Sequence, residues 1–314
     1  MPRSMTVMLL NISQVERDTG LSKDVLRMWE RRYSFPQPSR DANGERLYDA
    51  AQIDKLRAIK RLMDAGFRPG KLTDMSLKEL TALTRQRGGD HWGVVTATVQ
   101  TLFTDLIKAH DRPALEGHLR QLLLRQGVQE FVLRTAAPLT TAVGDAWMRG
   151  EMEIFEEHLY TELLQGVLRS AIQALPGRRK APVILLTTLP DEQHGLGLLM
   201  VEALLAANGV PCVSLGTGTP PSEIAVAAAR HQVDIVALSF SAGFPLRQAE
   251  SASELLRDSL EPRTGLWIGG ALAARMKRLR SDIVRLPVLD EVMPSVAAWY
   301  AAHPGTQDKD GQLI

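Results

Sequence analysis

The chain has 314 residues, of which 45% are hydrophobic and 23% charged, a composition typical of a folded globular protein. Its single cysteine, Cys212, excludes an internal disulfide framework, and no apolar run approaches the roughly 18 residues of a membrane span. The N-terminus is too short and too weakly apolar for a secretory signal. We therefore expect a cytoplasmic protein of two or three domains with no membrane partner.

The formal net charge of +1 is unevenly divided along the chain. Residues 1–75 hold 14 Lys and Arg against 10 Asp and Glu, whereas the remainder holds 23 against 26. A basic N-terminal block on a near-neutral body is typical of proteins that bind a polyanion through that block, and a solvated charged surface explains the charge equally well.

Two short helices are predicted near the N-terminus. Ser13 and Glu16 have the spacing of a capping box for the first helix, which Gly20 interrupts. Ser22 can cap the second helix, whose apolar stripe includes Trp29. This spacing indicates a helix–turn–helix.

A hairpin and a third helix follow. Asn43-Gly44 is a strong hairpin turn signal, and Asp49 with Gln52 can open a helix that runs to about residue 65. In such a unit the second helix enters the major groove while the hairpin follows the phosphates. The cations of the second helix and the hairpin that we predict to bind DNA are Lys23, Arg27, Arg31, Arg40 and Arg46.

The string over residues 26–33 (LRMWERRY), followed by a proline, Arg40, Gly44-Glu45-Arg46 and Tyr48, closely resembles the MerR winged-helix family. The resemblance implies that Arg27, Arg40 and Arg46 face DNA. Trp29 and Tyr48 are expected in the core of the small domain. MerR proteins usually dimerise on a near-palindrome, so the resemblance implies a double-stranded DNA operator and a homo-oligomer, a dimer or tetramer.

The rest of the chain consists of two segments with different sequence patterns. Residues 94–175 are helical and apolar-rich, with breaks that suit four or five helices in a bundle. After a basic linker at 176–182, short aliphatic runs at 183–186, 210–215, 235–238 and 266–268 alternate with helical segments. This alternation predicts a parallel sheet with helices on both faces, and ligands of such sheets bind where the strands end.

The clearest candidate for a ligand site lies just after the first of these strands, where Glu192, His194 and Gly197 are close in sequence. A histidine there can ligate a metal ion, and the nearby carboxylate can accept a hydrogen bond from its other ring nitrogen. The remaining histidines are scattered, so no zinc cluster is evident. One protein ligand suits a metal held by a macrocycle, and heme and corrinoid both qualify.

The ordered set Glu192-x-His194-x-x-Gly197, Ser239-x-Ser241 and Gly269-Gly270 resembles the cobalamin-binding fold of methionine synthase, corrinoid mutases and the CarH/LitR regulators. The resemblance implies that His194 is the lower axial ligand of cobalt. It also implies that the nucleotide tail of cobalamin enters a slot lined by the serine and the paired glycines. Ser241 departs from this pattern, which usually has leucine there.

A second match lies in the helical segment. Trp147 and the pair Glu157-His158 have the spacing W-x9-EH, which resembles the cap bundle of the CarH/LitR regulators. The resemblance implies that these residues cover the upper cobalt face and an adenosyl group, so adenosylcobalamin is the expected cofactor. In light-sensing members a histidine often follows the tryptophan, but here that position is Met148.

We therefore predict a multidomain α and α/β protein, with a winged helix–turn–helix at 1–80, a helical cap bundle at 94–175 and a Rossmann-like cobalamin-binding domain at 181–303. The predicted function is a non-enzymatic transcriptional regulator, a repressor whose DNA binding is controlled by cobalamin and by light through cobalt–carbon photolysis and a change of assembly. Two alternatives remain: a light-independent cobalamin sensor or regulator with a second chromophore, and a corrinoid-dependent methyl carrier or enzyme.

Overall fold

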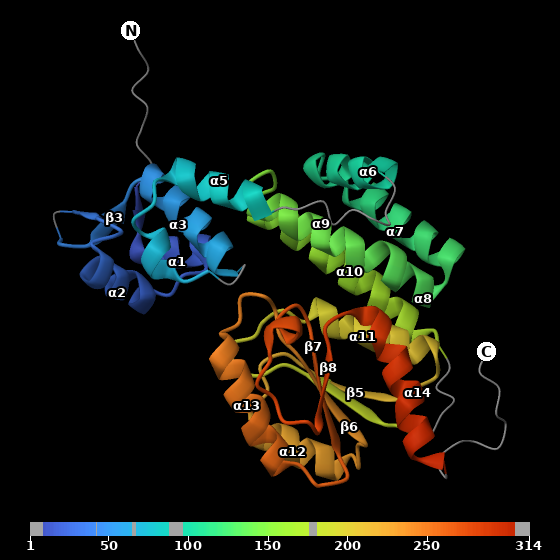
Figure 1. Cartoon of the computed structure of the whole chain (residues 1–314). Coiled ribbons are helices and arrows are strands. Elements are labelled where there is room, and N and C mark those ends of the chain that lie inside the picture. The colour runs from blue at the N-terminus through green and yellow to red at the C-terminus, as the bar shows by residue number, and fades with distance from the viewer. Residues whose placement is uncertain (1–8, 42, 65–66, 88–96, 176–180, 305–314) are drawn as a thin grey trace. The chain divides into compact units, whose positions relative to one another are not determined.

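The computed structural model describes residues 9–41, 43–64, 67–87, 97–175 and 181–304 (Figure 1). Internal contacts divide the chain into two compact units. The first unit combines residues 1–90 with 145–153, and the second combines 91–144 with 154–314. The predicted linker at 176–182 lies mostly outside the described residues. No helix in the described ranges has the length and apolarity needed to cross a membrane.

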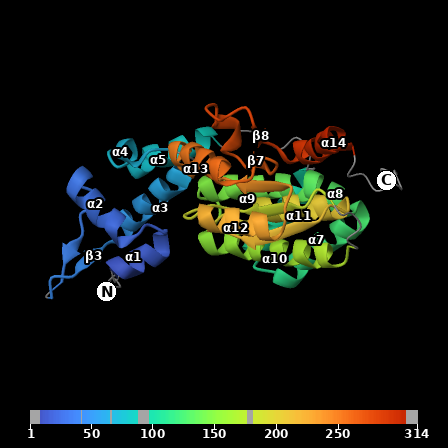
Figure 2. The same cartoon turned by 90° about the horizontal axis from the view of Figure 1, so that it is seen from below.

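The first unit is a small helical domain with a three-stranded antiparallel sheet, in the order β1-β3-β2. The hairpin of β2 and β3 projects beside α2 (Figure 2). Its elements are β1 (Leu10–Asn11), α1 (Ile12–Thr19), α2 (Lys23–Tyr33), β2 (Ser39–Arg40), β3 (Arg46–Tyr48), α3 (Ala50–Asp64), α4 (Pro69–Leu72) and α5 (Leu77–Arg87).

One helix of this unit begins at a different cap from the one predicted from the sequence. The capping box of α1 is formed by Asn11 and Gln14, not by Ser13 and Glu16. Asn11 also pairs with β3, so sheet pairing fixes where α1 begins. The predicted cap of α2 is confirmed, because Ser22 Oγ accepts a hydrogen bond from the backbone N–H of Val25.

The core of the first unit joins α2 to α3. Trp29 and Tyr48 are buried, as predicted, with 1% and 0% of their surface exposed. They pack in one apolar cluster with Leu26 of α2 and with Leu56 and Ile59 of α3. Because the two helices share this packed core, a movement of α3 would displace α2.

The second unit begins with the predicted helices. They are α6 (Ala97–Lys108), α7 (Arg112–Gln126), α8 (Val128–Phe131), a π-helical segment η1 (Val132–Ala136), α9 (Ala137–Met148) and α10 (Ile154–Gln173). Buried Phe131 and Tyr160 belong to this layer, and the Tyr160 hydroxyl hydrogen-bonds Thr140 Oγ1 at 2.9 Å. The last residues of α9, from Asp145 onward, are grouped with the first unit.

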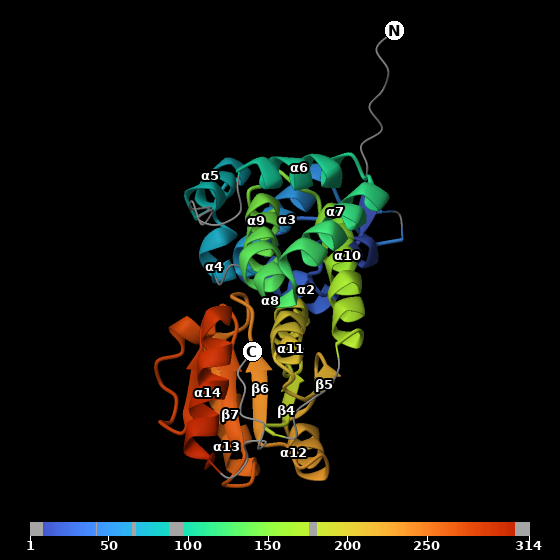
Figure 3. The same ribbon diagram turned by 90° about the vertical axis from the view of Figure 1, so that its right-hand side faces the viewer.

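The second unit ends in a five-stranded parallel sheet, in the order β5-β4-β6-β7-β8 (Figure 3). β8 was not predicted from the sequence. The strands are β4 (Ile184–Thr187), β5 (Cys212–Gly216), β6 (Ile235–Ser239), β7 (Gly265–Gly269) and β8 (Ile283–Leu286). The helices are α11 (Leu196–Ala207), α12 (Pro221–Arg230), α13 (Leu246–Ser259) and α14 (Val292–Ala302), with short 3-10 turns η2 (Ala273–Arg275) and η3 (Leu289–Glu291).

Alternation along the strands buries both faces of this sheet. Val236 and Leu238 of β6 pack toward α12 and α13, whereas Ile235 and Ala237 pack toward α11 and α14. Figure 1 shows these two pairs of helices on opposite sides of the sheet. With both faces covered, the open positions for a ligand are at the ends of the strands.

Candidate DNA-binding and cofactor-binding sites

The first unit exposes three of the five predicted DNA-binding cations. Arg27 and Arg31 on α2 and Arg40 on β2 are exposed, and the Arg27 side chain retains 53% of its accessible surface. Arg27 pairs with Asp24 at 3.3 Å, an exposed contact that contributes little and is readily exchanged for a phosphate. Helix α2 and the hairpin thus present cations on adjoining elements.

The other two predicted cations are held by carboxylates. Arg46 Nε donates to Glu30 Oε2 at 2.7 Å, and this bond raises the pKa of Arg46. The pair ties β3 of the hairpin to α2. Lys23 forms a salt bridge with Glu16, in which Nζ lies 3.5 Å from Oε2. Both cations were predicted to bind DNA, and these intramolecular partners were not predicted from the sequence.

In the second unit, the loop between β4 and α11 holds Glu192 and His194. His194 Nδ1–H donates to Glu192 Oε1 at 2.6 Å, and the backbone N–H of His194 donates to the same oxygen at 3.0 Å. The two side chains differ sharply in exposure, 1% for Glu192 and 66% for His194. A buried carboxylate therefore orients an imidazole that extends from the loop.

Ser241, from the loop after β6, and Thr188, from the same loop as Glu192, hold Glu192 in place. Its Oε2 accepts the backbone N–H of Ser241 at 2.7 Å. Thr188 Oγ1 donates to the Glu192 carbonyl at 2.7 Å and accepts the N–H of Gly218. Burial alone would raise the pKa of Glu192, but the hydrogen bonds from His194 and Ser241 outweigh burial and lower that pKa. Thr188 and the anchoring contact of Ser241 were not predicted.

The remaining predicted residues of the second unit lie at neighbouring strand ends. Ser239 pairs with Gly269 in the β6–β7 register, and a Cβ on Gly197 would lie 3.6 Å from Ser239 Oγ. Gly270 has φ +86°, and a Cβ there would lie 2.3 Å from the Phe240 carbonyl oxygen. Only glycine allows this close approach of two strand ends.

The donor chemistry of this loop fits a metal held by a macrocycle. Donation from Nδ1 fixes the His194 tautomer in which Nε2 carries the lone pair that a metal requires. The ring lies at the carboxyl edge of the parallel sheet, where ligands of open α/β folds bind. No group of three or more His, Cys, Asp or Glu side chains among the described residues is arranged to hold a metal ion.

The predicted cap residues fall into both units. Trp147 and Met148, at the end of α9, are half-buried and belong to the first unit. Glu157 and His158, near the start of α10, belong to the second. His158 Nδ1–H donates to Glu157 Oε2 at 2.6 Å, and Thr161 Oγ1 donates to Glu157 Oε1 at 2.7 Å. Glu157 is thus a positioned carboxylate.

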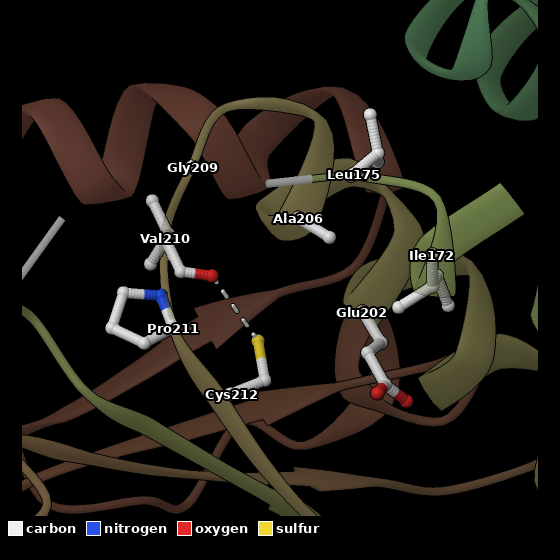
Figure 4. A pocket seen from close by; sticks show the side chains of 8 residues that line it. All are labelled: Ile172, Leu175, Glu202, Ala206, Gly209, Val210, Pro211 and Cys212. Carbon is white, nitrogen blue, oxygen red and sulfur yellow. Dashed lines mark hydrogen bonds between the residues drawn. The ribbon is translucent and has the colours of Figure 1, made fainter. Parts of the chain in front are cut away.

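A separate hollow of about 180 Å³ lies where the chain enters β5 (Figure 4). Burial raises the pKa of the Cys212 thiol to about 12, and its Sγ lies 3.7 Å from the Val210 carbonyl oxygen. Because this end of β5 is the amino edge of the sheet, the hollow lies away from the His194 loop. Its volume is below the usual range of small-molecule sites. The residues that line it are Ile172, Leu175, Glu202, Ala206, Gly209, Val210, Pro211 and Cys212.

Comparison with protein families finds three matches along the chain. Residues 10–79 match the MerR HTH family of regulatory proteins. Residues 182–287 match a B12 binding domain, and residues 99–171 match a second B12 binding domain. The first match covers α1–α4, and the second covers the sheet with the His194 loop.

Similar proteins extend these matches over most of the chain. The HTH-type transcriptional repressor CarH of Myxococcus xanthus is 29% identical over 259 residues, 81% of this chain and 86% of that protein. The repressor CarA of the same organism is 27% identical over 256 residues, 81% and 83% of the two chains. A Methanosarcina barkeri monomethylamine corrinoid protein has a similar fold, with 16% identity and a TM-score of 0.51 over 63% of this chain and 96% of that one.

These matches agree with the architecture predicted from the sequence: a helix–turn–helix unit, a helical region and a Rossmann-like parallel sheet. A DNA-binding domain at one end and a cofactor-binding domain at the other are typical of a regulator rather than an enzyme. The chain is a MerR-type transcriptional regulator that contains a B12-binding domain.

Proposed function

We propose that this regulator is a repressor whose DNA binding is controlled by adenosylcobalamin and by light. The observation that carries the proposal is the imidazole of His194, oriented by buried Glu192 at the carboxyl edge of a B12-type sheet. The proposed domains are residues 1–80 for DNA, 94–175 for the cap and 181–303 for the cofactor.

In this proposal Nε2 of His194 would bind the cobalt of cobalamin, and Glu192 would keep the His194 ring in the required tautomer and orientation. Ser239, Ser241 and the glycines at positions 197, 269 and 270 surround the nucleotide tail. Ser241 also anchors Glu192. The bound cofactor supplies a cobalt–carbon bond that visible light breaks.

The upper side of the cofactor is assigned to the cap residues. Trp147 and Met148 cover the adenosyl group, and Glu157, held by His158 and Thr161, accepts hydrogen bonds from it. A cofactor that interacts differently with two assembly states shifts the equilibrium between them. The proposed dark state is an oligomer that holds a double-stranded operator, and light releases it.

DNA contact is assigned to the cations of the first unit. Arg27, Arg31 and Arg40 are exposed and reach phosphates or base edges. Arg46 and Lys23 join them after partial exchange of their carboxylate partners, or they position the hairpin and α2.

A second candidate, a light-independent cobalamin sensor, is favoured by one position. Light-sensing members of the CarH/LitR family, which this chain resembles, often have histidine at the position of Met148. A thioether is a weaker cobalt ligand than imidazole, so capture of cobalt after photolysis would need another side chain.

The test is to purify the protein in darkness with adenosylcobalamin and to record its visible spectrum, its size and its DNA binding before and after green light. His194→Ala should alter the spectrum of the bound corrinoid, and His231→Ala, an exposed histidine of the same unit, should not. A light-induced change of size and DNA binding supports the repressor controlled by light. A bound corrinoid indifferent to light supports the sensor, and the absence of corrinoid binding contradicts both.

A further inference from the structure

Arg61, on the last turn of α3, lies against residues at the end of α9 and in the connection that follows it. Its Cζ is 5.7 Å from the centroid of the Trp147 ring, in a cation–π arrangement. A Cβ on Gly150 would lie 2.8 Å from Arg61 Nη1, so the guanidinium rests directly on the backbone of the α9–α10 connection. All three residues belong to the first unit.

The guanidinium of Arg61 is incompletely satisfied there. Its Nε is buried without a hydrogen-bond partner among the described residues. Burial lowers the pKa of Arg61, although the charge of Glu153 partly opposes this effect. One turn earlier on α3, Arg57 forms two salt bridges. Its Nη2 lies 2.8 Å from Asp18 Oδ1, and its Nη1 lies 3.1 Å from Asp54 Oδ1. At Arg61 the indole face of Trp147 and the Gly150 backbone lie against the guanidinium.

Such a residue is sensitive to the position of its aromatic partner. A buried Nε–H without a hydrogen bond is costly, so a shift of the Trp147 ring would release or rearrange the Arg61 side chain. Arg61 is also attached to the helix whose Leu56 and Ile59 pack on Trp29 and Leu26 of α2. A continuous packed path thus leads from Trp147 to the helix that presents Arg27.

We propose that Arg61 couples the cofactor site to DNA binding: it responds to the placement of Trp147 and passes the response through α3 to α2. The inference rests on the proposed function, in which Trp147 covers the cofactor. Arg61 is a positioning residue in this proposal. It contacts Trp147 and the chain backbone, and its effect on DNA comes through the packing of α3 against α2.

The test compares DNA affinity with and without adenosylcobalamin, in darkness, for the full-length wild type and three variants. The DNA is the tightest-binding duplex selected from a random library with the wild-type protein. Arg61→Met keeps the length and apolar packing of the side chain but removes the guanidinium, and Arg61→Gln is a second neutral replacement. Arg61→Lys keeps a cation over the indole. Arg68→Ala, which removes an exposed arginine of the same unit, is the control.

For the wild type the ratio of the two affinities should fall in the range of about 5 to 150-fold that is usual for coupled sites. Arg61→Met and Arg61→Gln should bring the ratio to within about twofold of one, with cobalamin still bound as judged by its visible spectrum. Arg61→Lys should keep most of the coupling, and Arg68→Ala should keep all of it.

Three outcomes overturn the inference. Retention of the wild-type ratio by the neutral variants removes Arg61 from the coupling. An equal loss of affinity with and without cofactor makes Arg61 a DNA contact. Loss of the circular dichroism of folded protein in both neutral variants makes Arg61 a structural residue. If the wild type itself shows no response to adenosylcobalamin, the proposed function fails, whatever the variants do.

Discussion

Glu192 and His194 stand two positions apart and form a buried acceptor with an exposed ring. The carboxylate uses one oxygen for His194 and the other for Ser241, so it is fixed from two loops. Replacing Glu192 with Gln puts an amide N–H₂ against one of these two donors. The imidazole then loses either its orientation or its charged partner.

We expect Glu192→Gln to weaken cobalamin binding by about 10- to 100-fold, the usual effect of losing the partner of a metal-bound histidine. Titration followed by visible absorbance measures the change in dissociation constant. Glu223→Gln, at an exposed position of α12, is the control and should bind as the wild type does. Equal affinities for all three proteins would show that the pair does not serve the cofactor.

Gly270 is required for its backbone conformation rather than for a side-chain contact. Its φ of +86° disfavours any L side chain, and a Cβ would press on the Phe240 carbonyl at 2.3 Å. Gly270→Ala should lower the free energy of unfolding by about 2 kcal/mol or more. Gly265→Ala, whose Cβ would meet its neighbours at ordinary distances of 3.6 and 3.7 Å, is the matched control. Chemical denaturation followed by circular dichroism compares them, and similar stability of both variants would contradict the argument.

At the scale of elements, the N-terminus of α3 shows how a cap connects to pH. Asp49 Oδ1 accepts the backbone N–H of Gln52 at 2.8 Å, and this bond, with a second from the Gln52 side chain, lowers the pKa of Asp49 from its ordinary 3.8. A folded-state pKa below the unfolded one means that the stabilisation is complete above the unfolded value. It is lost as pH falls through the folded value.

Asp49→Ala should therefore destabilise the protein by about 1 kcal/mol at neutral pH, the usual cost of losing an N-cap. The difference from the wild type should shrink as the pH is lowered below about 4, where Asp49 becomes protonated. Asp49→Asn keeps the cap and removes the titration. Urea unfolding of the three proteins at neutral and acidic pH measures this, and a difference independent of pH would disprove the assignment.

The sequence predicted most of these elements because their signals are local. Ser22 before α2, Gly20 after α1 and the aliphatic runs of four strands are readable without tertiary information. β8 was missed because its two central residues are exposed, so it lacks both alternation and a continuous apolar run. At α1 the capping box was predicted at Ser13 and Glu16, but Asn11, which pairs with β3, caps the helix instead.

The candidate sites likewise contain contacts that are local in the sequence and contacts that are not. His194 and Glu192 are close in sequence, so their partnership was predictable. The bonds of Glu192 to Ser241 and of Arg46 to Glu30 join segments 49 and 16 residues apart. No pattern in the sequence specified these bonds, because they depend on how the strands and helices pack.

At the scale of the whole molecule, charge is concentrated where DNA is expected. The first 75 residues carry an excess of four positive charges, with 14 Lys and Arg against 10 Asp and Glu. The structure brings exposed members of this set onto α2 and the hairpin, while Arg46 and Arg57 are occupied by carboxylates. A net charge near neutrality for the chain therefore conceals a local cationic surface.

This distribution predicts how DNA binding responds to salt. Each phosphate contact releases condensed counterions, so losing one contact should make the slope of log affinity against log salt less negative by about 0.9. Arg27→Ala should weaken binding to the selected duplex and reduce the slope by about this amount, because the Arg27 side chain is exposed on α2. Arg169→Ala, which removes an exposed arginine from the second unit, should change neither quantity. Fluorescence anisotropy at several salt concentrations measures both, and an unchanged slope for Arg27→Ala would mean that this face of α2 does not meet the phosphates.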